Sequence, residues 1–167
     1  MLYATAFLFP ILMLFAAWMD LFTMRIANWI SIVLTLAFLP LALACGLRSG
    51  LIGQHYLCGL AILAPTFALF AFGKIGGGDA KLAASSAIWI GWGSLFDYII
   101  ISSLLGGVLA VVILAARRVP LPLFLLRWSW VARLHEPKTG IPFGVALGAG
   151  AIIVYPYTAI WLAAVGA

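Results

Sequence analysis

The residues best suited to chemistry are two aspartates that lie far apart in the chain, Asp20 and Asp79. Each stands at the edge of a long apolar run, and Asp79 follows three consecutive glycines, Gly76, Gly77 and Gly78. Two carboxyl groups that lie close together share a proton, so one can act as general base on a water molecule while the other donates a proton to a peptide carbonyl. The pair therefore fits aspartyl proteolysis, provided that the fold brings the two side chains together.

The glycines before Asp79 have a physical use beside a catalytic carboxylate. Glycine lacks a Cβ atom, so it allows positive φ and the close approach of another backbone, as an extended peptide requires when it pairs with a loop. An aspartate directly before a helix is also an ordinary N-cap, and glycines before it form an ordinary loop. The stretch GGGD at 76–79 alone fits both roles equally, and it is the second carboxylate, Asp20, that favours catalysis.

The composition indicates the environment in which these residues work. Of the 167 residues, 66% are hydrophobic and 8% are charged, and the mean hydropathy is +1.24, far above that of a soluble globular domain. We therefore expect an integral membrane protein whose partner is the lipid bilayer. The first apolar run, residues 2–19, lacks the basic region and the small-residue cleavage site of a secretory signal, so we expect it to remain as a transmembrane helix.

A helix needs about 20 apolar residues to cross the hydrocarbon core of a bilayer. On this basis we expect an all-α, polytopic membrane protein with six transmembrane helices, forming a single membrane-embedded domain over residues 1–167. The predicted spans are residues 2–19, 29–46, 54–73, 81–93, 95–116 and 141–164. The fourth span is short and GWGS at 91–94 is the only plausible turn after it, so spans four and five are expected to form a tight hairpin.

Basic residues are concentrated in alternate loops. Eight of the nine Lys and Arg residues lie in the first, third and fifth loops, which leaves only Arg48 in the others. The positive-inside rule then places these three loops in the cytoplasm and both termini outside it. Asp20 and Asp79 are therefore expected at similar depth on the cytoplasmic face. We expect the net charge of +5 to serve orientation and anionic lipid headgroups, with no nucleic-acid partner.

The longest polar interruption covers residues 117–140. It mixes Arg127 and Arg133 with leucines and with Trp128 and Trp130. Tryptophan and arginine both settle at headgroup depth. We therefore expect an interfacial amphipathic segment between spans five and six.

The motifs around the aspartates resemble those of the type IV prepilin peptidases, which are membrane aspartyl proteases. The second catalytic motif of that family is GxGD, often continuing to a lysine two residues on, and it corresponds here to the run from Gly76 to Lys81. Its first motif is Asp, five residues, then Ile-Pro-Asn; here DLFTMRIAN places Asp20, Ile26 and Asn28 in register, with Ala27 where proline is usual. The stretch GIPFGVALGAGAI at 140–152 resembles the last-span motif of the family.

The resemblance implies a function and a set of site residues. Asp20 and Asp79 would be catalytic, and no metal or other cofactor is expected. The substrate would be a prepilin or pseudopilin whose short basic leader is removed at the cytoplasmic face of the bacterial inner membrane. Residues expected to contact the substrate are Gly76, Gly77, Gly78, Lys81, Arg25 and Asn28. Longer family members carry paired CxxC motifs that are associated with amino-methylation. This chain has no such motif, so it resembles the short form found with Flp-type, tight-adherence pili. That resemblance implies peptidase activity without N-methyltransferase activity.

Several alternatives remain open at this point. Lys81 also fits a snorkelling residue that sets topology, and Asn28 fits a helix cap. Cys45 and Cys58 fall near the ends of a predicted helical hairpin, where they could form a disulfide or remain two inert thiols. A small transporter or channel subunit could use membrane-edge carboxylates to relay protons, but it would favour carboxylates spread through the bilayer depth. A membrane scaffold would tolerate Asp20→Asn and Asp79→Asn, and the presenilin-like proteases are a near alternative that shares GxGD.

Overall fold

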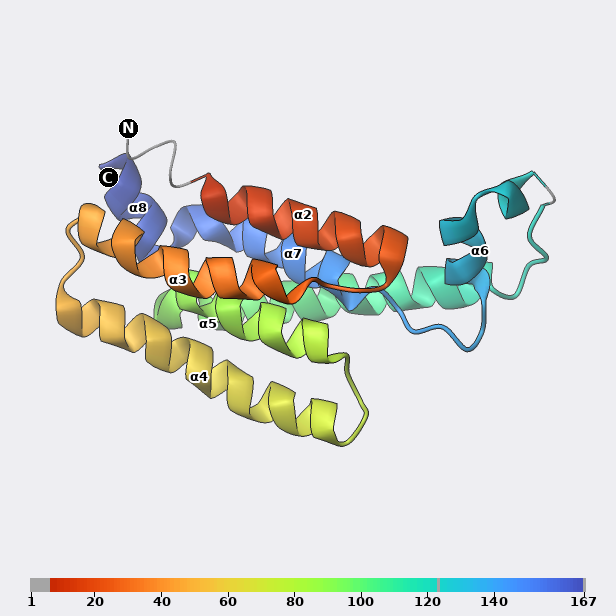
Figure 1. Cartoon of the computed structure of the whole chain (residues 1–167), viewed down its shortest axis with the longest axis horizontal. Helices are drawn as coiled ribbons and strands as arrows, with labels where there is room; N and C mark the ends of the chain where they lie inside the picture. The colour runs from red at the N-terminus through yellow and green to blue at the C-terminus, as the bar shows by residue number, and fades with distance from the viewer. Residues whose placement is uncertain (1–6, 123, 167) are drawn as a thin grey trace.

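The computed structural model describes residues 7–122 and 124–166, and the secondary structure of this part is entirely helical. The long helices lie side by side along the long axis of the molecule, and α6 stands beyond one end (Figure 1). In chain order the elements are α2 (Leu8–Thr23), α3 (Asn28–Ala44), α4 (Ser49–Ala71), α5 (Gly77–Ala116), η1 (Leu125–Arg127), α6 (Ser129–His135), α7 (Phe143–Val154), η2 (Tyr155–Tyr157) and α8 (Ala159–Val165). The all-α prediction is confirmed for this part of the chain; residues 2–6 of the first predicted span lie outside it.

The apolar helices differ in whether they can cross a bilayer. By length and composition α4 and α5 can do so, and a third span results if Phe143–Tyr157 and Ala159–Val165, bent by 53° to each other, count as one. The helices α2 and α3 are apolar but shorter than 18 residues. Large apolar side chains such as Leu36, Phe67 and Phe96 are well exposed, as expected of surfaces that face lipid. The count of six spans stays a prediction.

Helix α5 is two helices joined by a sharp break at Gly91. This residue has φ 69° and ψ 171°, a backbone conformation that residues with a Cβ atom rarely adopt. A Cβ atom there would also lie 2.5 Å from the His55 ring. The two halves run back along each other, as Figure 1 shows, and they bring Tyr98 beside Ser86. The sequence places this turn in residues 91–94, whereas the structure makes it at Gly91 alone.

An aromatic core fills the end of the molecule near this break. Phe9, Phe38, Trp89 and Tyr155 are all essentially inaccessible to solvent. The rings of Phe9 and Trp89 are stacked with centroids 5.2 Å apart, and Trp89 Nε1 donates a hydrogen bond of 2.8 Å to the carbonyl oxygen of Leu34. Because the buried indole N–H is paired, the core joins α2, α3, α5 and η2 without leaving this donor unsatisfied.

The predicted interfacial segment forms only short helical pieces in its described residues, namely η1 and α6. Its ends are held by arginines: Arg117 donates to the carbonyl oxygens of Leu134 at 2.8 Å and Thr139 at 2.9 Å. Arg133 donates to the carbonyl oxygen of Phe22 at the end of α2, at 3.1 Å. The segment is therefore docked against the same end of the bundle as α2's last turn, and its membrane-surface role stays a prediction.

Candidate active site

Asp20 lies in the last turn of α2, which ends in an unusual way. Met24 has φ 55°, in the left-handed region, and its N–H donates to the carbonyl oxygen of Asp20 at 2.8 Å. This left-handed residue closes the helix and turns the chain back toward α3. The turn places the Ile26 side chain against both Gly78 and Gly144, where added Cβ atoms would lie 3.1 and 2.8 Å from it. Ile26 thereby joins three segments around Asp20.

The Asp20 carboxyl is buried, with 6% of its residue surface exposed, and it is held by the start of α7. The backbone N–H of Gly144 donates to Asp20 Oδ2 at 2.7 Å. The N-cap of α7 is Pro142, which offers no side-chain cap, so Asp20 satisfies an N–H that the helix itself leaves unpaired. The positive end of the helix dipole also stabilises a negative charge at this position.

Glycines on α7 let this helix come close enough to α2 for the hydrogen bond between Gly144 and Asp20. A Cβ atom on Gly144 would lie 2.8 Å from Asp20 Oδ2, and one on Gly148 would lie 2.9 Å from the Met13 carbonyl oxygen of α2. Small residues four apart let two apolar helices approach backbone to backbone, as membrane helices commonly do. The stretch 140–152 does not by itself indicate a role for Gly144. The signal that could have found it is the glycine pair at spacing four.

Asp79 is the third residue of α5 and does not cap it. The N-cap is Gly76, so the alternative in which Asp79 is the N-cap of this helix does not hold. Instead the carboxyl reaches back toward the backbone N–H of Gly76, as the third residue does in a capping box. Its other oxygen, Oδ1, is buried and has no hydrogen-bond partner.

The structure brings Asp20 and Asp79 together at one end of the bundle. The two carboxyl groups are near enough for the charge of Asp20 to act on Asp79. The Ile26 side chain lies next to both Gly144, which bonds Asp20, and Gly78, which precedes Asp79. Each carboxyl has one oxygen that accepts a backbone N–H, from Gly144 for Asp20 and from Gly76 for Asp79, and the second oxygen of Asp79 is buried without a partner. This arrangement suits a pair that shares one proton.

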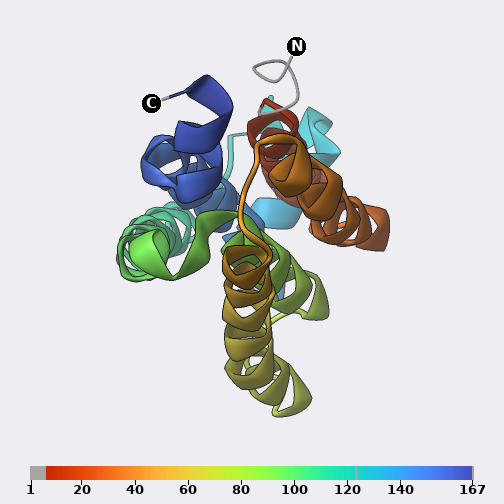
Figure 2. The same cartoon turned by 90° about the vertical axis from the view of Figure 1, so that its left-hand side faces the viewer.

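A cavity of about 770 Å³ begins at Asp79. It runs between the second half of α4, both halves of α5 and the start of α7, with largely apolar walls that include Ile62, Leu69 and Leu147. Figure 2 shows α4 projecting away from the rest of the bundle. The cavity is large enough for a peptide segment next to the carboxyl pair.

A model of the type IV leader peptidase family matches residues 7–111, which is more than half of the chain. The chain belongs to this family. It is therefore a member of a family of peptidases, and its apolar helices agree with a membrane protein. The match includes Asp20 and Asp79 and ends before Gly144. Comparisons with curated proteins and with solved structures gave no match.

The other predicted site residues lie in different surroundings. Lys81 Nζ donates to Asn28 Oδ1 at 2.9 Å. Both residues line a second groove of about 580 Å³, between α3, α4 and α5, and not the cavity at Asp79. Asn28 is the first residue of α3, whose N-cap is Ala27, so the expected Asn28 cap is wrong. Arg25 is exposed in the link between α2 and α3.

The glycines before Asp79 differ in role: one lines the cavity and another allows close helix packing. Gly76 lines the cavity beside Asp79. A Cβ atom on Gly77 would lie 3.0 Å from the Phe70 ring, so this glycine lets the start of α5 lie against the end of α4. Cys45 and Cys58 are both free thiols, so the structure holds no disulfide between them.

Proposed function

We propose that this leader peptidase is a membrane aspartyl endopeptidase that removes the short basic leader of Flp-like type IV prepilins or pseudopilins at the cytoplasmic face of the bacterial inner membrane. The observation that carries the proposal is the pairing of Asp20 with Asp79 at the mouth of a large, mostly apolar cavity. Two carboxyl groups at the membrane edge beside such a cavity can hydrolyse a substrate's peptide bond at the point where its apolar helix meets its extended, polar leader.

In the proposed reaction, Asp20 removes a proton from a water molecule while the water oxygen attacks the scissile carbonyl carbon. Asp79 gives its proton to the carbonyl oxygen, which produces a tetrahedral gem-diol. Asp20 then passes its proton to the leaving nitrogen as the C–N bond breaks, and Asp79 recovers a proton from the diol. The Gly144 N–H supports the anion on Asp20 at the start, and the unpartnered Asp79 Oδ1 suits the protonated partner.

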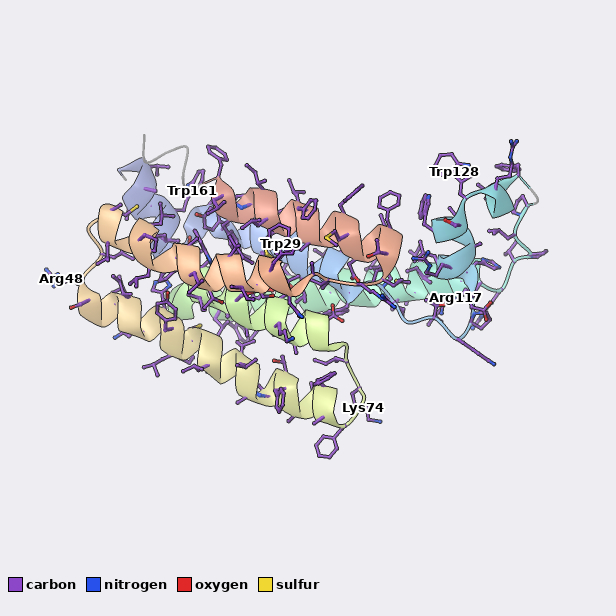
Figure 3. The ribbon with its side chains drawn as sticks, viewed as in Figure 1. Trp29, Arg48, Lys74, Arg117, Trp128 and Trp161 are labelled. Atoms are coloured by element: carbon purple, nitrogen blue, oxygen red, sulfur yellow. The ribbon has the colours of Figure 1, made fainter. Side chains whose placement is uncertain are left out.

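The charge distribution supports the cytoplasmic placement. In Figure 3, Lys74 and Arg117 lie toward the end of the molecule that holds the aspartates, and Arg48 lies at the other end. By the positive-inside rule the aspartate end faces the cytoplasm. Helix α2 begins and α8 ends at the opposite end (Figure 1), which agrees with both termini outside. The proposed topology has six spans, with α2 and α3 as short ones.

The remaining site residues have proposed roles in substrate contact. Gly76, Gly77 and Gly78 would let the extended substrate backbone pass beside Asp79. Arg25, Lys81 and Asn28 lie exposed around the same end of the bundle and would meet residues that flank the cut. We further propose that the protein lacks methyltransferase activity, because its two cysteines, Cys45 and Cys58, form no CxxC motif.

Co-expression with candidate small prepilins tests this function, with leader removal read by gel shift. Asp20→Asn and Asp79→Asn are each expected to lower the processing rate by about 10²- to 10⁴-fold, the usual contribution of a positioned acid or base. Asp97→Asn is the matched control, because Asp97 is an exposed aspartate of the second half of α5, outside the residues that line the cavity. Undiminished processing by either of the first two variants would remove that residue from the mechanism.

A further inference from the structure

The Arg117 side chain donates hydrogen bonds to three backbone carbonyl oxygens within residues 134–140. Its Nε donates to Leu134 at 2.8 Å, and its Nη2 donates to Thr139 at 2.9 Å and to Gly140 at 3.1 Å. None of these carbonyls belongs to α5, although Arg117 is the residue that ends this helix. The side chain therefore does not cap α5 but fastens its end to α6 and to the link that follows α6 (Figure 3). We call these three hydrogen bonds the Arg117 clamp.

The link held by the clamp leads directly to the backbone N–H that Asp20 accepts. Residues 136–142 are not helical, and Gly140, whose carbonyl is clamped, precedes Gly144 by four positions. The backbone between these two glycines has little freedom, because Pro142 has a fixed φ and the residue before a proline is restricted as well. A displacement of the clamped carbonyl is therefore passed on to the N–H at the start of α7.

The clamp also reaches the other side of this contact. Leu134, whose carbonyl is clamped, follows Arg133, and the Arg133 side chain donates to the Phe22 carbonyl oxygen at 3.1 Å. Phe22 lies two residues after Asp20 in the last turn of α2. Contacts thus run without a break from the helix that carries the carboxyl, through α6 and the clamp, to the N–H that bonds it. Both partners of the 2.7 Å hydrogen bond are held by the same set of contacts.

We propose that Arg117 is a positioning residue for peptide hydrolysis: by holding the link before α7, it keeps the Gly144 N–H on Asp20 and so fixes the orientation of this carboxyl. The inference rests on the proposed function and adds to it a residue that does not line the cavity. Arginine suits this role because its planar guanidinium presents several N–H donors in a fixed geometry, whereas the lysine ammonium is a point charge on a flexible stem. The clamped atoms are neutral carbonyl oxygens, so the clamp depends on that geometry and not on charge alone.

The test uses the purified full-length protein in lipid nanodiscs with a cleavable prepilin. Arg117→Lys keeps the positive charge that orients the loop and removes the fixed set of donors. A displacement of about 1 Å can cost about 10²-fold in rate, and we expect a smaller shift, with kcat per folded molecule about tenfold lower and KM within about threefold of wild type. Arg118→Lys is the matched control: Arg118 is adjacent and exposed, and its side chain makes no hydrogen bond to the described residues, so kcat and KM should not change.

A double-mutant cycle with Gly144→Ala shows whether Arg117 acts through the contact with Asp20. If both changes disturb the same hydrogen bond, Arg117→Lys combined with Gly144→Ala should lose about as much kcat/KM as Gly144→Ala alone, which is about 30-fold, whereas independent effects would multiply to about 300-fold. Backbone hydrogen exchange over residues 140–144 should also become faster in Arg117→Lys and stay unchanged in Arg118→Lys. Arg117→Gln, matched by Arg118→Gln, is a second variant and should lower kcat at least as much.

Three results would overturn the inference: wild-type kcat per folded molecule in Arg117→Lys and Arg117→Gln, a loss confined to KM, or multiplied losses in the double variant. A lower melting temperature with wild-type kcat per folded molecule would show that the clamp serves only the fold. Asp20→Asn runs alongside. Cleavage by that variant would overturn the proposed function, whereas an inactive Asp20→Asn with a fully active Arg117→Lys overturns only this inference.

Discussion

Gly144→Ala tests whether the start of α7 positions the Asp20 carboxyl, which we propose to be catalytic. The added methyl group would lie 2.8 Å from Asp20 Oδ2 and 2.8 Å from Ile26 Cδ1. Neither neighbour can move far, because Asp20 is buried and Ile26 is held between two backbones. The carboxyl must therefore rotate away or α7 must withdraw, and both movements break the 2.7 Å hydrogen bond from Gly144 N.

The expected loss follows from the kind of hydrogen bond that is broken. A hydrogen bond to a charged group contributes about 1.5–3 kcal/mol, and a factor of ten in rate corresponds to about 1.4 kcal/mol. A loss of about 2 kcal/mol in the orientation and stabilisation of the Asp20 anion therefore lowers kcat/KM about 30-fold. The melting temperature should also fall by a few degrees, because α7 no longer packs as closely on α2.

The assay is prepilin cleavage by purified variants, normalised to the folded fraction. Two glycine variants serve as controls. Gly107→Ala adds a methyl group with nothing within 4 Å, so it should keep full activity and gain up to about 1 kcal/mol of stability from the better helix former. Gly148→Ala would place its methyl group 2.9 Å from the Met13 carbonyl oxygen. It should lower stability with a smaller effect on kcat/KM, because no atom is added beside Asp20.

The reasoning is refuted if Gly144→Ala cleaves at the wild-type rate per folded molecule. It is also refuted if Gly148→Ala loses as much activity as Gly144→Ala, because the effect would then come from helix separation alone. A 30-fold loss restricted to Gly144→Ala would show that the contact with Asp20 is the part that matters.

Three further variants test other parts of the structure. Gly91→Ala places a Cβ atom on a residue with φ 69° and against the His55 ring, so the melting temperature should fall by about 5–10 °C. Gly93→Ala, which has open space around it, is the control. Equal melting curves for the two variants would contradict strain at the Gly91 turn. Lys81→Met removes the hydrogen bond to Asn28 and should lower stability by at most about 1 kcal/mol. It should also raise KM for the prepilin, because the proposed contact of Lys81 with the substrate is lost, and an unchanged KM would show that Lys81 serves only the fold. Met24→Gly relieves a left-handed residue with φ 55° and should raise stability by about 1 kcal/mol in a thermal melt, and a lower melting temperature would disprove strain at that position.

The sequence predicted the elements more reliably than their ends. Long apolar runs indicate helices because backbone groups in a bilayer must be paired within the segment, and a helix is found in the described part of every predicted span. The ends were less certain. Helix α4 begins at Ser49, five residues before the predicted span, and α5 continues through all three residues that were expected to follow Gly91 in a turn. Polar or glycine-rich residues can extend a helix once tertiary contacts support it.

The sequence by itself determined which chemical groups are present. The chain is apolar, its basic residues are concentrated in alternate loops, and two aspartates stand at the edges of apolar runs, one of them directly after three glycines. These are local properties, because hydropathy and residue type depend only on what is written in each segment. Only the tertiary structure decided which groups meet. The Gly144 N–H reaches Asp20 across 124 positions of sequence, and the second half of α5 folds back to set Tyr98 and Ser102 in the cavity at Asp79. Those contacts depend on how closely α2, α5 and α7 pack, and that distance is set by small residues on facing helices, which no single segment reveals.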